Sequence, residues 1–475
     1  MKTIKTIITI LVCSITFTAC DNFLDITPEG QIKRDELLST TEGIEDALYG
    51  AYSQLRSNSL YGQYLSFNTL EVLAQTFTCK DNATITALSK YDYTNTNVKD
   101  VFSPIWTAMY KNISNVNSIL DAPLVAEAKE YPYTIYKGEA LGLRAFMHFD
   151  LVRLFAEQIT VNAEAEGIPY AAKFSLETPE FEPLSKNYEH ILTDLHEAER
   201  LLANEKDYHG SSYFMTDRQI HCNLYAVQAL LARVYLTMGD YEQAAQYAQK
   251  VIEKSPYKLV EKTEIYGDIA GVLSKKETLF GIYYAEWYTT IFNMLYSDTD
   301  RTSLDLRKDI ETIYEKYLAG DDYRWTKHFR ATDRGYRLDK LTDIYELAGE
   351  LVERPQGQIL GINLIRMPEM YYIMAEALLK AEQHSEATWY FDRVLESRGL
   401  TPLTNRVPAE EVTMEHINLE RFKEYIGEGQ TFYNLKRQNE AISTWDEATN
   451  TEKAILASKD IYVIPIPENE YENRY

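Results

Sequence analysis

Cys20 has the most specific chemistry in this sequence, because a thiol at the end of an apolar N-terminal run is a site for lipid attachment. Two lysines come first, an apolar stretch follows over residues 7–19, and the small Ala19 precedes the cysteine. This stretch is too short to cross a hydrocarbon core of about 30 Å as a helix, and its length and flanks are typical of a signal peptide. We therefore predict that residues 1–19 are a lipoprotein signal peptide and that Cys20 carries lipid, palmitate included. Ordinary secretion, with Cys20 left as a plain thiol, is the alternative.

The polar residues form no pattern that is specific for catalysis or metal binding. With 72 acidic side chains, the spacing of carboxylates carries no information about glycoside hydrolysis. His190 and His196 are too far apart to share a helical face at metal-ligand distance, and His416 with Glu420 is more often a surface contact. Residues 427–429, Gly-Glu-Gly, lack the Lys-Ser/Thr of a phosphate loop and favour a structural turn. We expect no enzymatic activity, no metal and no cofactor, and an exported hydrolase is disfavoured.

Composition describes an acidic chain with few cysteines. The net charge of −24 argues against attraction to nucleic acid or anionic lipid. Tyrosine outnumbers phenylalanine, 37 to 17, which favours aromatic groups at wet boundaries over a dry core. Cys79 and Cys222 remain in the mature chain, and both a disulfide and two buried thiols suit them.

The candidate ligand-binding residues are aromatic. A sugar ring packs its C–H face on an aromatic ring while its hydroxyls bond to nearby polar groups. Packing at the base of a loop is the alternative for each residue. Trp106 and Trp389 lie in helical patterns and are expected in the core. The candidates lie in two loop regions: Tyr61, Tyr64, Tyr91 and Tyr93 with the polar Asp81 and Asn82 in the first, and Trp287 and Tyr288 in the second.

Helical periodicity positions these loops. Apolar residues recur at three- and four-residue steps over residues 41–55, 105–120, 136–157 and 188–204. Residues 58–98 are rich in Tyr, Asn, Thr and Ser and indicate long loops around one helix near 67–77. These helices form the scaffold on which the first set of aromatic candidates is carried.

Residues 224–256 have the spacing of a tetratricopeptide helical hairpin, in which small Ala232 and Ala244 let two helices approach and Gly239 permits the turn. A weaker copy spans residues 374–399. Such units cannot bury their faces alone, so several must stack. Between 257 and 362 the pattern breaks, with a strand-like alternation over 278–287 and a helix near 307–319. We predict a mainly α fold with tetratricopeptide-like hairpins as scaffold and a loop-rich insertion with short strands.

Several segments, in order, resemble the SusD/RagB family of outer-membrane nutrient-binding lipoproteins from Bacteroidetes. The segments are Cys20-Asp-Asn-Phe-Leu-Asp, residues 138–155 (GEALGLRAFMHFDLVRLF), the hairpin around Gly239, residues 365–377 (IRMPEMYYIMAEA), residues 419–429 (LERFKEYIGEG) with 433–437, and the closing 464–470 (IPIPENE). The resemblance covers nearly the whole mature chain.

The resemblance implies a single SusD-like domain over residues 20–475. Its parts would be an N-terminal helical part (20–256), a ligand-side insertion (257–362) and a C-terminal SusD/RagB segment (363–475). It also implies a lipid-anchored protein on the outer face of the outer membrane. Such a protein captures oligosaccharide or peptide and delivers it to a SusC-like TonB-dependent transporter without cleaving it. A structural helical adaptor with no small ligand is the alternative.

Overall fold

A computed structural model describes residues 33–474, except 80, 209, 211–212, 262–271, 292–293, 296–303, 316–321, 333–334, 342–358 and 473. The predicted signal peptide, Cys20 and the segment that follows it lie outside the described residues. Helices dominate the described chain and its strands are short, which confirms the mainly α prediction.

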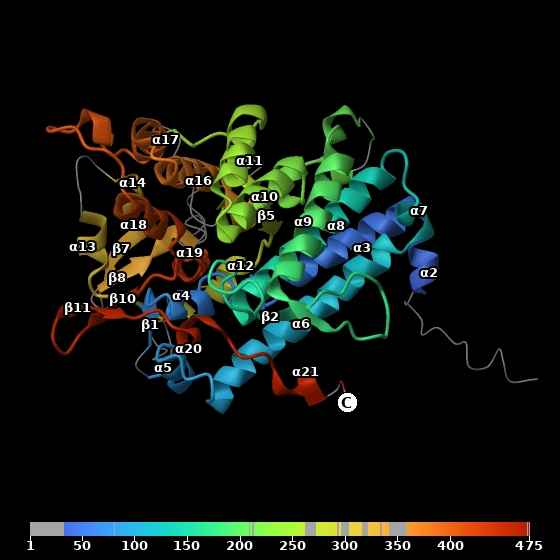
Figure 1. The fold of residues 1–475 in the computed structure, drawn as a ribbon, viewed down its shortest axis with the longest axis horizontal. Helices are drawn as coiled ribbons and strands as arrows, with labels where there is room; N and C mark the ends of the chain where they lie inside the picture. The colour runs from blue at the N-terminus through green and yellow to red at the C-terminus, as the bar shows by residue number, and fades with distance from the viewer. Residues whose placement is uncertain are drawn as a thin grey trace, which may run out of the picture.

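Four long helices lie together on one side of the molecule (Figure 1): α3 (Thr41–Leu55), α6 (Thr96–Leu120), α8 (Tyr133–Phe155) and α9 (Leu184–Leu202). The spacing of apolar residues predicts all four helices, although α6 begins nine residues before its predicted start at residue 105. Asn95 caps that start by accepting a hydrogen bond from the Asn97 amide, a local signal independent of the apolar stripe.

Helix α8 is buried on every face from Gly138 to Phe155, whereas the sequence predicts one apolar stripe. A helix in this position must pair its own polar side chains, because unpaired buried groups are costly. Arg144 forms a two-point ion pair with Asp194 of α9, with both N···O distances 2.7 Å. Glu139 accepts a hydrogen bond of 2.5 Å from the Tyr52 hydroxyl of α3. The polar side chains of α8 thus tie it to its neighbours.

Two helical hairpins follow the predicted tetratricopeptide pattern and lie near the middle and upper left of Figure 1. The first joins α10 (Leu224–Met238) to α11 (Tyr241–Lys254) through Gly239, which adopts a φ of 76° that a side chain would disfavour. The second joins α16 (Met367–Lys380) to α17 (His384–Ser397), and α11 packs on α16. The two predicted hairpins are therefore confirmed and stack on each other.

The strands form small antiparallel sheets. Strand β9 (Ile359–Arg366) lies between β4 (Val272–Leu273) and β5 (Thr278–Tyr283), so the end of the predicted insertion pairs with its beginning. Strand β1 (Phe77–Thr78) pairs with β6 (Asp305–Leu306), which brings the first loop region against the insertion. The other pairs are β2 (Glu166–Pro169) with β3 (Phe181–Pro183), β7 (Phe329–Thr332) with β8 (Gly335–Leu338), and β10 (Ile442–Asp446) with β11 (Thr451–Ile455).

Short helices complete the chain, and some differ from the predictions. The region 58–98 holds two of them rather than one, and Trp287 begins a helix where a loop was expected. The remaining α-helices of the described residues are α2 (Arg34–Leu37), α4 (Thr69–Leu73), α5 (Ala83–Leu88), α7 (Pro123–Ala126), α12 (Trp287–Ile291), α13 (Ile310–Glu315), α14 (Tyr323–His328), α18 (Met414–Tyr425), α19 (Gln430–Gln438), α20 (Lys459–Tyr462) and α21 (Glu468–Glu472).

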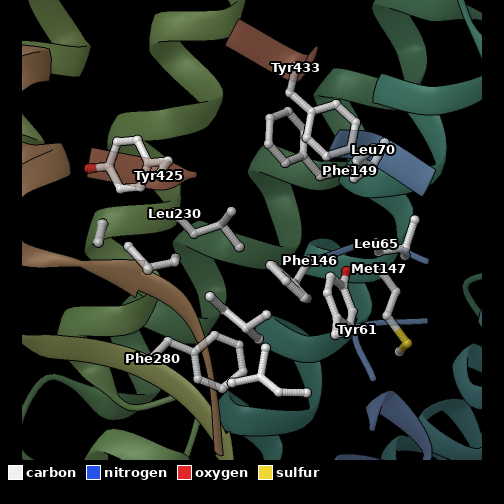
Figure 2. Close-up of a cluster of buried hydrophobic side chains, with 14 of the residues drawn as sticks. Tyr61, Leu65, Leu70, Phe146, Met147, Phe149, Leu230, Phe280, Tyr425 and Tyr433 are labelled. Carbon is white, nitrogen blue, oxygen red and sulfur yellow. The ribbon is translucent and has the colours of Figure 1, made fainter. Parts of the chain in front are cut away.

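Aromatic side chains join the N-terminal helices to the insertion (Figure 2). The Phe146 ring of α8 lies 5.5 Å from the Tyr61 ring on one side and 5.5 Å from the Phe280 ring of β5 on the other. Trp106 is buried as predicted, but Trp389 is 51 % exposed, so the prediction that Trp389 belongs to the core is wrong. The apolar residues of the α16–α17 hairpin lie on more than one helix face. The sequence pattern does not show which of these faces another helix covers, and the face that carries Trp389 is left exposed.

A buried ion network centred on Glu424 connects the insertion to the C-terminal segment. Glu424 accepts hydrogen bonds from Arg324 at 3.2 Å, Arg366 at 2.6 Å and Arg398 at 3.0 Å. We call the set of described residues joined in this way the Glu424 network: Glu277, Asp322, Glu420, Glu424 and Glu428 with Arg324, Lys340, Arg366, Arg398 and Lys423.

Charge balance makes this network tolerable in the interior. Five carboxylates face five cations in it, and breaking one such pair leaves an uncompensated buried charge. Burial raises the pKa of Glu424, but Arg398 and Arg366 outweigh burial and hold the pKa well below its usual range. A depressed carboxyl pKa stabilises the fold above the pKa of the unfolded chain, about 4.3, and this contribution is lost as the pH falls.

Replacing Glu424 with glutamine should lower the free energy of unfolding by about 3–5 kcal/mol, because three arginines lose their shared anion. Denaturant unfolding followed by circular dichroism would measure the loss. Glu396→Gln is the matched control, since Glu396 pairs with Arg393 at the surface of α17 and should change stability by at most about 1 kcal/mol. Equal stabilities for the two variants would contradict the role assigned to the network.

Candidate functional site

Three of the predicted tyrosines lie in the interior with their hydroxyls bonded to protein groups. Tyr61 is 2 % exposed and its hydroxyl donates to Asp150 of α8. Tyr91 donates to the Leu73 carbonyl oxygen at 2.8 Å, and Tyr93 donates to the Ile461 carbonyl oxygen at 2.8 Å. These rings fill packing positions, which is the alternative stated for them above.

Trp287 is also buried, with 4 % of its surface exposed. Its indole N–H donates to the Gly62 carbonyl oxygen at 2.9 Å, and its ring meets Phe67 edge-on at 6.1 Å. The two predicted loop regions therefore do come together, with Trp287 as the contact between them. Tyr64 is half-buried against the core. The backbone of Tyr288 belongs to α12, but its side chain lies outside the described part of the structure.

The two polar candidates stand at the start of α5. Asn82 caps this helix, its side-chain oxygen accepting from the Thr84 and Ile85 amides at 3.0 and 3.1 Å. Asp81 is exposed and lines a shallow hollow of about 480 Å³ with Lys90. Neither residue is brought against Trp287 by any contact among the described residues.

An aromatic surface that sequence reasoning missed lies where β5 ends and α12 begins. Tyr283 is 51 % exposed at the last position of β5, and Tyr284 next to it is half-buried. The Arg56 guanidinium lies 5.5 Å from the centre of the Tyr284 ring, a distance at which a cation is attracted to the ring face. We call Arg56, Tyr283 and Tyr284 the tyrosine surface.

Local geometry explains how the tyrosine surface is positioned. The chain turns tightly after α3, and a side chain at Gly62 would place its Cβ 2.2 Å from the Arg56 carbonyl oxygen. This turn presents the Gly62 carbonyl oxygen to Trp287, so the first loop region and the β5–α12 junction hold each other. One sequence feature could have identified Tyr283: it lies near the end of the strand-like alternation, where side chains are no longer covered by the sheet's neighbours.

The tyrosine surface has the chemistry of a binding site for a polar ring. It combines the exposed Tyr283 side chain with the adjacent Tyr284, whose ring lies against the Arg56 guanidinium. Within the described ranges no group of three or more His, Cys, Asp or Glu side chains is placed to hold a metal ion. Cys79 and Cys222 are both buried and do not form a disulfide. No helix in the described part of the chain is long and apolar enough to span a membrane.

Comparison with known sequences identifies the family. Residues 212–474 match the profile described as "SusD family", and residues 22–236 match the one described as "Starch-binding associating with outer membrane". The chain belongs to the SusD family. It is 23 % identical to SusD-like protein P2 of Formosa agariphila over 512 aligned positions, which cover 98 % of this chain and 96 % of that protein.

Solved structures share the fold. A SusD superfamily protein from Bacteroides fragilis aligns with a TM-score of 0.72 and 22 % identity over 92 % of this chain and 98 % of its own. A structure described as a laminarin-binding SusD-like protein aligns with a TM-score of 0.64 and 20 % identity, over 84 % of this chain and 91 % of its own. These likenesses confirm the predicted SusD-like fold.

Replacing Trp287 with alanine should lower the free energy of unfolding by about 3–5 kcal/mol, because it opens a cavity and removes the bond to Gly62. Trp389→Ala is the matched control, since Trp389 is exposed on α17 and its loss should cost about 0.5 kcal/mol or less. Thermal and denaturant unfolding would compare the two. A Trp287→Ala protein as stable as the control would contradict the packing role.

Proposed function

We propose that this protein is a lipid-anchored protein of the outer-membrane surface that binds oligosaccharide and delivers it to a SusC-like TonB-dependent transporter. Its membership of the SusD family supports a nutrient-binding role. A protein of the same fold that binds laminarin supports carbohydrate as the ligand. The observation that carries the proposal is the tyrosine surface, in which the exposed Tyr283 is followed by Tyr284, whose ring lies against the Arg56 guanidinium.

The physical basis is ring stacking with a few directed hydrogen bonds. The C–H face of a pyranose removes apolar area from water when it covers the Tyr283 ring, and Arg56 supplies donors for sugar hydroxyls. A surface with one exposed ring gives modest affinity. Such affinity suits a protein that must release its cargo to a transporter, and the ligand leaves unchanged because the protein does not catalyse its cleavage.

A peptide ligand and a purely structural role remain as alternatives. Tyrosine and arginine are also common in surfaces that bind peptides, so an extended peptide is the second candidate ligand. The stacked hairpins α10–α11 and α16–α17, with Trp389 exposed on α17, suit an adaptor without a small ligand. Binding screens with glycans and peptides decide between these, since an adaptor gives no signal with either.

Replacing Tyr283 with alanine should weaken oligosaccharide binding about tenfold, equal to about 1.4 kcal/mol, and leave the melting temperature unchanged. Isothermal titration calorimetry with a panel that includes laminarin oligosaccharides would measure it. Tyr213→Ala, which removes an exposed tyrosine from another surface, is the control and should bind normally. Unchanged affinity in Tyr283→Ala would show that the oligosaccharide binds at another site. Shortened oligosaccharide after incubation with the pure protein would contradict a binding role without catalysis.

Replacing Cys20 with alanine should release the protein from the membrane fraction and abolish labelling with radioactive palmitate, because no thiol is left to carry lipid. Fractionation and labelling in the native host would test both effects. Cys79→Ala removes a buried thiol and should stay in the membrane fraction. Cys20→Ala protein that remains both membrane-bound and labelled would rule out Cys20 as the site of lipid attachment.

A further inference from the structure

A cavity in the described part of the molecule lies away from the tyrosine surface. It has a volume of about 540 Å³ and lies between α8, α10, α13, α18 and α19 beneath the β10–β11 hairpin. Sites for small ligands measure about 300–1,000 Å³. Its rim reaches solvent at the exposed Thr312 and Glu452. Neither Arg56, Tyr283 nor Tyr284 is among its described lining residues.

The arginines of the inner wall outnumber by one the carboxylates with which they pair. Arg233 forms a two-point ion pair with Glu369, and Arg307 forms one with Asp309, with N···O distances of 2.6–2.7 Å. These two pairs are internally balanced. Arg153 of α8 likewise pairs with Asp150 on the same helix.

Two further arginines of the wall share a single carboxylate. Arg421 and Arg437 both pair with Glu376. Burial raises the pKa of Glu376, but the two arginines lower it to about 2, so this residue is a carboxylate. The five arginines of the inner wall therefore pair with four carboxylates, of which Asp309 and Glu369 line the cavity and Asp150 and Glu376 lie behind it. A fifth carboxylate, Glu452, is exposed at the rim and accepts a hydrogen bond of 2.5 Å from the Ser443 hydroxyl.

Polar atoms in the same wall are buried without a partner. Each belongs to a side chain that is more than nine-tenths buried, and none has a hydrogen-bond partner among the described residues. An unsatisfied buried donor costs about 1–3 kcal/mol. The atoms are Arg153 Nε, Arg421 Nη2 and the hydroxyls of Tyr425, Thr431 and Tyr433.

These atoms specify the chemistry of a ligand. The guanidinium nitrogens can only donate, so they need acceptor oxygens, and the hydroxyls can donate or accept. Phe422 and Trp445 line the same cavity and provide apolar ring faces. Figure 2 shows Tyr425 and Tyr433 at the edge of the buried cluster that includes Phe149.

We propose that this cavity is a second ligand site, separate from the tyrosine surface, and that it binds a small sugar acid such as a uronic acid. The carboxylate compensates the surplus charge at Arg421 and Arg437. The sugar hydroxyls satisfy Tyr425, Thr431 and Tyr433, and Phe422 or Trp445 covers the C–H face. The site lies between the N-terminal helices and the C-terminal segment, so ligand binding also stabilises the contact between them.

Calorimetry with sodium glucuronate, sodium galacturonate and neutral glucose tests the proposal on the mature protein. We expect a uronate to bind at least tenfold more tightly than glucose, because glucose lacks the carboxylate. The melting temperature should rise when the uronate is added, since a ligand that binds only the folded state stabilises it. No binding of either uronate at about 10 mM, well above a Kd of 1 mM, would mean that the cavity holds water only and would overturn the proposal.

Tyr433→Phe distinguishes a ligand contact from a structural role. It removes a hydroxyl that has no partner in the protein, so the melting temperature should stay level or rise while uronate affinity falls at least fivefold. Tyr314→Phe is the matched control: its hydroxyl donates to the Lys423 carbonyl oxygen at 2.7 Å, so this variant should lose stability and keep its uronate affinity. Unchanged uronate affinity in Tyr433→Phe would overturn the site. Tyr283→Ala should keep uronate binding, which separates this test from that of the proposed function.

Discussion

The Glu424 network is the constraint on which the rest of the structure depends. Its members come from α14 and the residue before it, from β9 and α18, and from the segments just before β5 and just after β8, α17 and α18, so charges far apart in the sequence meet around one carboxylate. Each charge is desolvated, and each is tolerated only because the others are in place. The insertion, which has little hydrophobic repeat of its own, is therefore held by ionic contacts to the C-terminal helices.

The turn that follows α18 connects the Glu424 network to the cavity wall. Residues 427–429 form a turn in which Gly427 and Gly429 have φ values of 79° and 70°, the left-handed conformation that favours glycine. The Gly429 amide donates to the buried Glu71 at 2.9 Å, which joins α19 to α4. Helix α19 then supplies Thr431 and Tyr433 to the cavity wall. The structural turn expected from the sequence is confirmed, and it orients one side of the proposed second site.

The excess of tyrosine has a structural explanation in this fold. Tyr61, Tyr91 and Tyr93 are buried, and each hydroxyl reaches a carboxylate or a backbone carbonyl. A phenylalanine there would leave that acceptor unpaired. Tyrosine thus connects segments that pack through polar contacts, and among the described tyrosines only a few, Tyr283 among them, are exposed for contact with a ligand.

The sequence by itself determined the long helices, the two hairpins and the family, because periodicity, the Gly239 turn and ordered motifs are local properties of the chain. It also located the two loop regions that the structure joins through Trp287.

Only the tertiary structure decided which aromatic side chains face outward. Trp287 and Trp389 are the same residue type, yet contacts from distant segments bury the first and leave the second exposed. The cavity also escaped sequence reasoning, since its unpartnered donors come from α8, α18 and α19 and meet only when these helices pack. Exposure and pairing are set by contacts between segments distant in sequence, and no local pattern records them.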